Sequence, residues 1–176
     1  MVKTEYYKDL TKMNTFGMKV KARCFIEYDS VADLVDIEFE ELARPVLHIG
    51  GGSNLLFTDD FKGTVLHSKI DFIEILDEGP EVLVSVGAGV VFDDFCAWAA
   101  KEGLWGVENL SYIPGEVGAS AVQNIGAYGV EVKDVIHRVY CYDTVDEEFV
   151  NFDVEECEYG YRDSIFKDPE VKGRYI

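Results

Sequence analysis

Two glycine-rich stretches of this chain contain the residues whose types and spacing best suit the binding of an anion. The first, residues 50–55, reads Gly-Gly-Gly-Ser-Asn-Leu and follows a short apolar run at residues 46–49. The second starts with Ile-Pro-Gly at residue 113 and extends to Gly129. Runs of small residues leave backbone N–H groups accessible, and clustered N–H groups bind phosphate without a cation. We therefore expect both stretches to line a site for a phosphate-bearing ligand.

Neither stretch matches a standard nucleotide-binding motif. No Gly-Lys-Ser/Thr follows residues 50–55, so they are not a P-loop, and Leu55 stands where a Rossmann fingerprint has its third glycine. Residues 87–92 contain another Gly-x-Gly before a predicted helix, but they also lack the third glycine. The alternative for any single loop is a tight turn in which glycine supplies a positive φ. Ser53 and Asn54 add side-chain donors, which favours a ligand site in the first stretch.

The second stretch allows two interpretations that the spacing leaves about equally open. Pro114 suits the first turn of a short helix, and Gly115, Gly118 and Ala119 leave that turn nearly bare. A bare helix N-terminus lets a flat ring or a phosphate approach closely. A helix packed tightly against a sheet also requires small residues, however, and that role needs no ligand.

A third candidate is the segment of residues 159–167, in which Arg162 lies beside Tyr161 and Asp163. A guanidinium group presents a planar fork of donors that can clamp a carboxylate. The same residues can form an ion pair on the surface, and from the chemistry alone we favour the surface ion pair.

The composition disfavours several classes of partner and site. The 176 residues carry a formal net charge of −18, which disfavours nucleic acid and anionic membranes as partners. The four cysteines and three histidines show no metal-ligand spacing, so we expect buried, reduced thiols and no metal site. No apolar run approaches the ~20 residues of a membrane span, and no signal peptide is evident. We therefore expect a cytoplasmic protein, and the sequence does not indicate its oligomeric state.

The hydrophobic pattern predicts an α+β fold divided into two small units, residues 1–68 and residues 69–176. Strands are expected where short apolar or alternating runs lie between turn residues, and turns are expected at residues 59–63 and 77–80. The expected strands are residues 20–28, 46–49, 64–67, 72–76, 82–86, 135–142 and 148–152.

Three helices are expected between these strands. The first is capped by Ser30 and carries Leu42 on its buried stripe. The second is capped by Asp93 or Asp94, and Gly103 follows its last turn. The third is the short helix of small residues that begins within the second glycine-rich stretch.

Taken together, these motifs resemble those of the UDP-N-acetylenolpyruvylglucosamine reductase family. The resemblance extends over nearly the whole chain, with the motifs in the same order. Asn-Thr-Phe-Gly at residues 14–17 is similar to the opening signature of the family. The other matching segments are residues 50–54, 113–115, 117–119, 123–129 and 161–167.

The resemblance implies a two-subdomain FAD-binding fold of the vanillyl-alcohol-oxidase/PCMH-like type, with the C-terminal substrate domain absent. It implies FAD as cofactor, NADPH as reductant and a UDP-sugar as substrate. The implied reaction reduces an enolpyruvyl ether to a lactyl ether and forms UDP-N-acetylmuramate for peptidoglycan. By this analogy the first stretch lies against the pyrophosphate, and the second lines the flavin and the ribityl chain. The residues assigned to FAD in this way are Gly50, Gly51, Gly52, Ser53, Asn54, Leu55, Ile113, Pro114, Gly115, Gly118, Ala119, Gln123, Asn124, Gly126, Ala127 and Tyr128.

The resemblance also assigns a catalytic role to Arg162. This residue matches the family arginine that binds the substrate carboxylate and stabilises the developing enolate, and Tyr161 is implied to be its neighbour on the substrate side. Family members continue into a third domain with a serine proton donor and a late glutamate, whereas this chain stops at Ile176. We therefore expect the FAD-binding part alone, without turnover. The alternatives are a flavin-binding module without chemistry and an FAD-dependent oxidase of the same superfamily.

Overall fold

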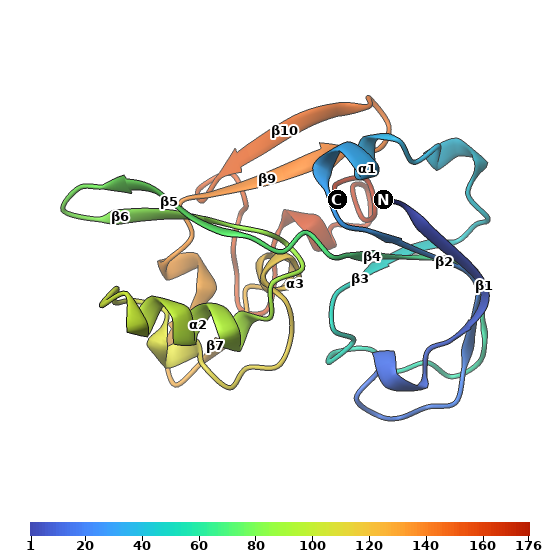
Figure 1. Ribbon diagram of the computed structural model, residues 1–176, viewed down its shortest axis with the longest axis horizontal. Helices are drawn as coiled ribbons and strands as arrows, with labels where there is room; N and C mark the ends of the chain where they lie inside the picture. The colour runs from blue at the N-terminus through green and yellow to red at the C-terminus, as the bar shows by residue number, and fades with distance from the viewer. The chain divides into compact units, whose positions relative to one another are not determined.

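The chain forms two compact units, which we call the N-terminal unit (Met1–Ile70) and the C-terminal unit (Asp71–Ile176). The computed structural model describes residues 1–176, apart from the side chain of Glu78. Figure 1 shows the order of the elements along the chain. Each unit has its own strands and its own apolar core.

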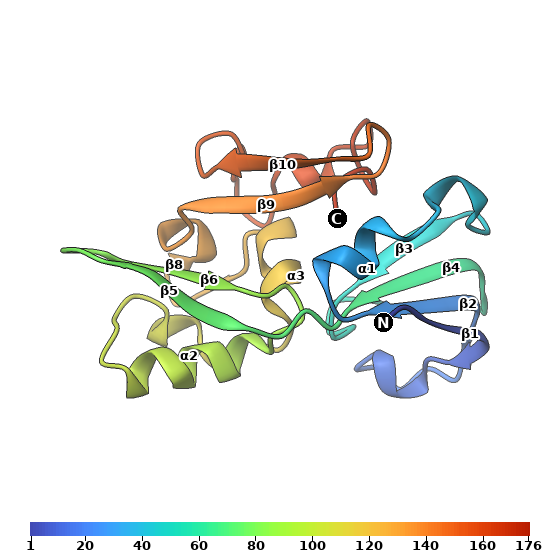
Figure 2. The ribbon, with the colours of Figure 1, turned by 45° about the horizontal axis from the view of Figure 1, so that its top comes forward.

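The N-terminal unit is built on one four-stranded sheet with the strand order β1-β2-β4-β3 (Figure 2). Strand β1 (Lys3–Asp9) runs antiparallel to β2 (Lys21–Tyr28), whereas β4 (Phe61–Ser68) is parallel to both β2 and β3 (Val46–Ile49). The central strands β2 and β4 are mostly buried, as expected for parallel strands. The core consists of Leu10, Val20, Ala22, Phe25, Ile49, Phe57 and Val65.

The first predicted helix is correct at its start and wrong at its end. Ser30 caps α1 (Val31–Val35) by accepting a hydrogen bond of 3.1 Å from the N–H of Asp33. The helix is only five residues long, and Leu42 lies beyond the short 3₁₀ turn η2 (Phe39–Glu41). Ile37 and Phe39 are both buried, and residues two apart on a helix do not share a face. Burying both side chains therefore requires the chain to leave the helix.

The turn expected at residues 59–63 is shorter than predicted. Lys62 and Gly63 belong to β4, where a side chain at Gly63 would meet the carbonyl oxygen of Pro45 at 1.8 Å. This glycine permits the close approach of two backbones rather than a turn.

The C-terminal unit combines three hairpins with two helices (Figures 1 and 2). The helices are α2 (Phe92–Lys101) and α3 (Val117–Val122), and the core cluster contains Phe92, Cys96, Leu110, Ile125 and Val132. The hairpins pair β5 (Ile73–Glu78) with β6 (Val82–Val86), β7 (Gly126–Ala127) with β8 (Val130–Glu131), and β9 (Arg138–Asp143) with β10 (Glu148–Asp153). The C-terminal unit also contains the short 3₁₀ turns η3 (Glu108–Leu110), η4 (Val132–Asp134) and η5 (Ile165–Lys167). A similar turn in the N-terminal unit is η1 (Thr11–Met13).

Two helix starts in the C-terminal unit differ from the prediction. The N-cap of α2 is Val91, which makes no side-chain capping bond, and Asp93 instead accepts a hydrogen bond of 2.8 Å from the N–H of Tyr112. Helix α3 begins at Val117, three residues after Pro114, because the intervening backbone pairs with Val91 in an antiparallel bridge. Tertiary pairing therefore decides both starts.

The end of the chain forms an isolated antiparallel bridge with β9, in which Tyr175 pairs with Asp143. Tyr142 and Ile176 exchange backbone hydrogen bonds of 2.7 and 3.0 Å. The ring of Tyr175 packs against Phe152 and Phe166, with ring centroids 5.0 and 6.5 Å away. Arg174 holds the buried carboxylate of Asp143 through its Nε at 2.8 and 3.0 Å.

The four cysteines are free and buried, as predicted. Burial raises the pKa of the Cys96 thiol to about 11. Among the described residues no cluster of three or more His, Cys, Asp or Glu side chains is placed to hold a metal ion. None of the described helices is long and apolar enough to cross a membrane.

Candidate functional site

The first glycine-rich stretch forms a loop at the carboxyl end of β3 in the N-terminal unit. Gly52 is buried and has a φ of +69°, which favours glycine over other residues. A Cβ at Gly52 would lie 1.9 Å from the carbonyl oxygen of Met13, so the loop passes directly over the main chain after β1. Gly51 and Asn54 are exposed, while Gly50, Ser53 and Leu55 are half-buried. The loop is thus fixed on one side and accessible on the other.

The turn at residues 14–17 holds this loop by donating hydrogen bonds to two carbonyl groups of the loop. The N–H of Thr15 donates to the carbonyl of Gly52 at 3.4 Å, and the Thr15 hydroxyl donates to the carbonyl of Ser53 at 3.3 Å. The turn itself is built around the buried side chain of Asn14, which donates to Leu10 and accepts from Met18. No function was predicted for these residues. The signal that marked them was their similarity to a family signature.

The backbone N–H groups of Gly51 and Gly52 donate to no acceptor within the described chain. Buried backbone N–H groups are nearly always paired, and Gly52 is buried. Since it has no acceptor within the described chain, this N–H is available to one from outside the protein, either water or a ligand. An anionic oxygen suits this position, since the loop offers donors without side chains that obstruct them.

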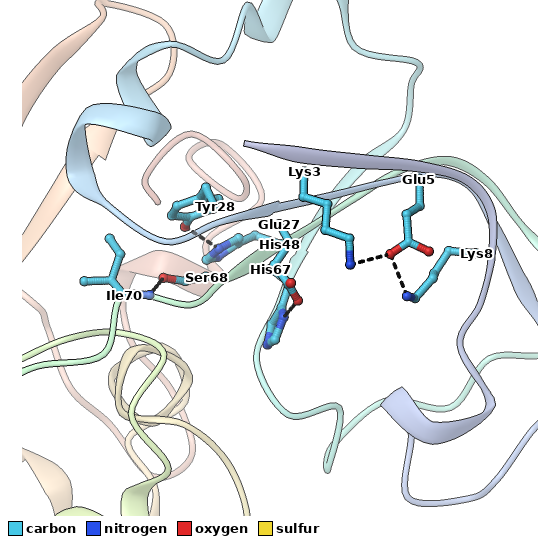
Figure 3. A network of polar contacts seen from close by, with 9 residues as sticks. All are labelled: Lys3, Glu5, Lys8, Glu27, Tyr28, His48, His67, Ser68 and Ile70. Atoms are coloured by element: carbon cyan, nitrogen blue, oxygen red, sulfur yellow. Dashed lines mark hydrogen bonds and ion pairs between the residues drawn. The ribbon is translucent and has the colours of Figure 1, made fainter. Parts of the chain in front are cut away.

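Polar side chains on the neighbouring strands fix the base of the loop (Figure 3). The buried hydroxyl group of Tyr28 lies 2.8 Å from Nε2 of His48, two residues before Gly50. His67 on β4 lies 3.2 Å from the carboxylate of Glu27 on β2. These contacts join β2, β3 and β4 and hold the register of the strand that leads into the glycines.

The first part of the second stretch is packed against the chain before α2. The N–H groups of Val117 and Gly118 donate to the carbonyls of Val90 and Ala88 at 2.9 and 3.0 Å. A Cβ at Gly118 would lie 2.7 Å from the Cβ of Ala88. Close packing, the second of the two open interpretations, therefore explains Gly118, and the N-terminus of α3 has no free donor at these two positions. Ile113, Gly115 and Ala119 are half-buried, and Pro114 is exposed.

The second part of the stretch lies at the other end of α3. After Gln123, the chain forms the β7–β8 hairpin, whose two turn residues Tyr128 and Gly129 have φ values of +54° and +85°. Positive φ at both positions is typical of a tight two-residue hairpin turn. The side chain of Tyr128 is fully exposed, whereas Gly126 and Ala127 are half-buried.

Arg162 lies in a tight turn that touches this hairpin. Gly160 and Asp163 exchange backbone hydrogen bonds of 3.0 and 3.2 Å, and Arg162 between them has a φ of +55°. Its Nη2 donates to the carbonyl of Gly126, and its guanidinium carbon lies 5.9 Å from the ring centre of Tyr161. Among the ion pairs of the described residues Arg162 takes part in none, so the favoured surface ion pair was wrong. Asp163 pairs instead with Lys167 at 3.8 Å.

Within the C-terminal unit, the structure brings some candidate residues together and separates others. Residues 123–128 and the Tyr161–Arg162 pair meet at the C-terminal end of α3. Residues 113–119 lie at the opposite end of this six-residue helix, roughly 9 Å away along its axis. Residues 50–55 belong to the other unit. Three of the candidate residues that are not glycine, Asn124, Tyr128 and Arg162, have positive φ.

Comparison with known proteins places these residues in a family. The family described as "FAD binding domain" matches residues 22–153. A UDP-N-acetylenolpyruvoylglucosamine reductase of Bacteroides fragilis is 56% identical over 169 residues, which cover 95% of this chain and 51% of that protein. The reductase of the same name from Neisseria meningitidis serogroup A is 49% identical over 174 residues, covering 97% and 50%.

A solved structure agrees with these matches. The crystal structure of UDP-N-acetylenolpyruvylglucosamine reductase from Thermus caldophilus superposes on this chain with a TM-score of 0.72 at 26% sequence identity. The superposition covers 93% of this chain and 56% of the Thermus caldophilus chain. The chain thus spans about half the length of the curated relatives it matches.

Proposed function

This chain belongs to the FAD-binding domain family, and from that premise we propose that it forms the flavin site of a UDP-N-acetylenolpyruvoylglucosamine reductase. The observation that carries the proposal is the loop of residues 50–55, in which the N–H groups of Gly51 and Gly52 have no acceptor among the described residues. The names of the relatives suggest the substrate. The geometry of the loop supports a cofactor that carries phosphate groups, as FAD does.

The loop after β3 fits the pyrophosphate of a dinucleotide. Its carbonyls are turned toward Thr15, and the donors of Gly51 and Gly52 have no acceptor within the described chain. A chain of net charge −18 repels a diphosphate at long range, so the local donors must outweigh that field. We assign Gly50, Gly51, Gly52, Ser53, Asn54 and Leu55 to this contact.

We assign the second stretch to the flavin and the ribityl chain rather than to a phosphate. The N–H groups of Val117 and Gly118 are already used within the protein, so these two positions at the N-terminus of α3 lack the donors that a phosphate needs. The residues assigned to the flavin and the ribityl chain, from both ends of α3, are Ile113, Pro114, Gly115, Gly118, Ala119, Gln123, Asn124, Gly126, Ala127 and Tyr128. Bound FAD supplies hydride transfer from NADPH to the enolpyruvyl group.

Arg162 is the proposed cation for the substrate. A preorganised guanidinium group stabilises negative charge that develops on the substrate carboxylate during reduction. Arg162 is exposed, pairs with no carboxylate of the described chain, and has one nitrogen fixed on the carbonyl of Gly126. The exposed ring of Tyr161 lies beside it and is proposed to contact the same substrate.

We propose small-molecule partners, a UDP-sugar and NADPH, and no nucleic-acid or membrane partner. The strong negative charge supports this proposal. We also propose a cytoplasmic location, because four free cysteines are typical of a reducing compartment.

Flavin binding by the purified chain tests the proposal. We expect absorbance bands near ~450 nm, either as purified or after addition of FAD. The Arg162→Ala variant should bind FAD as well as the wild type, because Arg162 is assigned to the substrate. A colourless protein that fails to take up added FAD would contradict the flavin site.

A further inference from the structure

Asn124 is the most completely buried polar residue of the second glycine-rich stretch. It has no exposed surface, and both ends of its amide are used within the protein. Its Nδ2 donates to the carbonyl of Gly160 at 2.9 Å, and its Oδ1 accepts from the N–H of Lys133 at 3.1 Å. Beyond these two bonds the amide has one more N–H and one more lone pair, but the side chain has no exposed surface and so presents neither of them to a ligand.

These two bonds join the segments that determine where the guanidinium group of Arg162 points. Gly160 is the first residue of the turn that carries Arg162, and Lys133 follows the hairpin that contains Gly126. The carbonyl of Gly126 in turn accepts from Arg162. The amide of Asn124 therefore connects the backbone that bears the cation to the backbone that receives its hydrogen bond.

Two further bonds hold the same turn. The hydroxyl of Ser164 donates to the carbonyl of Val122, the last residue of α3, at 2.6 Å. Lys167 donates through Nζ to the carbonyl of Arg162 at 2.6 Å. Such support is expected where a residue other than glycine is kept at positive φ, since that conformation costs energy unless its surroundings impose it.

We propose that Asn124 is a positioning residue, which acts through Arg162 and not through a side-chain contact with FAD. The inference rests on the proposed function, in which Arg162 binds the substrate carboxylate. It refines the assignment of Asn124 to FAD, because it leaves only the backbone of that residue near the flavin surface.

The test is the nearly isosteric variant Asn124→Asp in the complete gene product. Aspartate tolerates the positive φ of 46° and can still accept from Lys133, but it loses the donor to Gly160 and places two acceptors against each other. Asn151→Asp is the matched control, because Asn151 is exposed on β10 and the charge change is the same. We expect Asn124→Asp to lower kcat/KM for the UDP-sugar about 10- to 100-fold, with the Kd for FAD unchanged. The control should change neither.

A double-mutant cycle separates positioning from general damage. In an Arg162→Ala background, Asn124→Asp should cause no further loss of kcat/KM, because the residue it positions is gone. Equal losses in both backgrounds, or a rise in the Kd for FAD that parallels the loss, would overturn the proposal.

Hydrogen exchange gives a reading that does not depend on activity. The N–H of Asp163, which donates to Gly160, should exchange faster in Asn124→Asp than in the wild type or in Asn151→Asp. Unchanged exchange at Asp163 would overturn the positioning role. A wild type without NADPH-dependent reduction would contradict the proposed function, while the exchange result would still decide the role of Asn124.

Discussion

The two glycine-rich stretches look alike in sequence but differ in how their backbone N–H groups are used. In both stretches a glycine permits the close approach of another segment. A Cβ at Gly52 would lie 1.9 Å from the carbonyl oxygen of Met13, and a Cβ at Gly118 would lie 2.7 Å from the Cβ of Ala88. In the first stretch the carbonyls are held by Thr15, and the N–H groups of Gly51 and Gly52 have no acceptor within the described chain. In the second, the N–H groups that open α3 bond to carbonyls of the preceding loop.

This difference shows that glycine content alone does not identify an anion site. Glycine is required at Gly52 and at Gly118 by sterics, which says nothing about a ligand. The partners of the N–H groups are the more informative property, because only unpaired donors can bind a phosphate. On this basis we propose the pyrophosphate contact at the first stretch and not at the N–H groups of Val117 and Gly118.

The largest expected effect comes from Gly52→Ala. The added methyl group would clash with the carbonyl group of Met13, and alanine would have to adopt the positive φ of Gly52. The N-terminal unit should therefore lose more than about 3 kcal/mol of stability. Amide exchange of β2 and β4 measures this loss. The control is Gly17→Ala, whose φ is +63° with nothing within 4 Å, and which should cost about 1 kcal/mol. Equal losses at both positions would show that the clash with Met13 is not the reason for the glycine.

A smaller loss is expected for Gly118→Ala, of about 2 to 3 kcal/mol in the C-terminal unit. The nearest atom is the Cβ of Ala88, so Ala88→Gly in the same chain should restore much of the stability. Urea unfolding followed by the fluorescence of Trp98 and Trp105, the two tryptophans of the chain, reports on this unit. Gly79→Ala serves as the control, since its nearest contact is 3.6 Å. If Ala88→Gly gave no recovery, the packing explanation would fail.

Asp143→Asn should have a smaller effect still, and one that depends on pH. Burial raises the pKa of the Asp143 carboxyl. The hydrogen bonds from Arg174 and from the N–H groups of Val145 and Asp146 lower this pKa by more than burial raises it, so the net pKa lies below the usual value. Its contribution to stability is therefore present above the unfolded pKa of about 4 and is lost as the pH falls through the folded value. At neutral pH the urea midpoint of the variant should lie below that of the wild type. At acid pH the two midpoints should be the same. A difference that persisted at acid pH would contradict the ion pair.

The smallest expected effect is that of salt on FAD binding. If backbone donors rather than cations hold the pyrophosphate, screening removes no attractive ion pair and weakens the repulsion from the net charge of −18. The Kd for FAD should stay constant or fall as the salt concentration rises from about 50 to about 500 mM. A Kd that rises tenfold would point to lysine or arginine contacts instead.

Local sequence signals predicted much of the fold. Residues 46–49 and 82–86 form strands with the expected bounds, and Ser30 caps its helix. The edge strand β1 was missed because Lys3–Asp9 is polar and exposed on both faces, so it carries no alternating apolar pattern. The ends of α1 and the start of α3 depend on burial and on backbone pairing with distant residues, which spacing does not encode.

The motifs predicted candidate site residues, but they did not indicate how the hydrogen-bonding groups of those residues are used. No property of Val117 or Gly118 indicates that their N–H groups bond to carbonyls almost thirty positions earlier in the chain. Likewise, nothing in the segment around Arg162 indicates that Asn124 and Gly126 hold it in place. The order of the motifs identified the family, and the roles of the residues within it required the folded chain.

The most direct test of the central claim follows the amide resonances of the chain during titration with FAD. We predict large downfield shifts of the N–H signals of Gly51 and Gly52, because each gains an anionic acceptor, and small shifts for Val117 and Gly118, whose acceptors are already in the protein. Unmoved signals at Gly51 and Gly52 under saturating FAD would contradict the account.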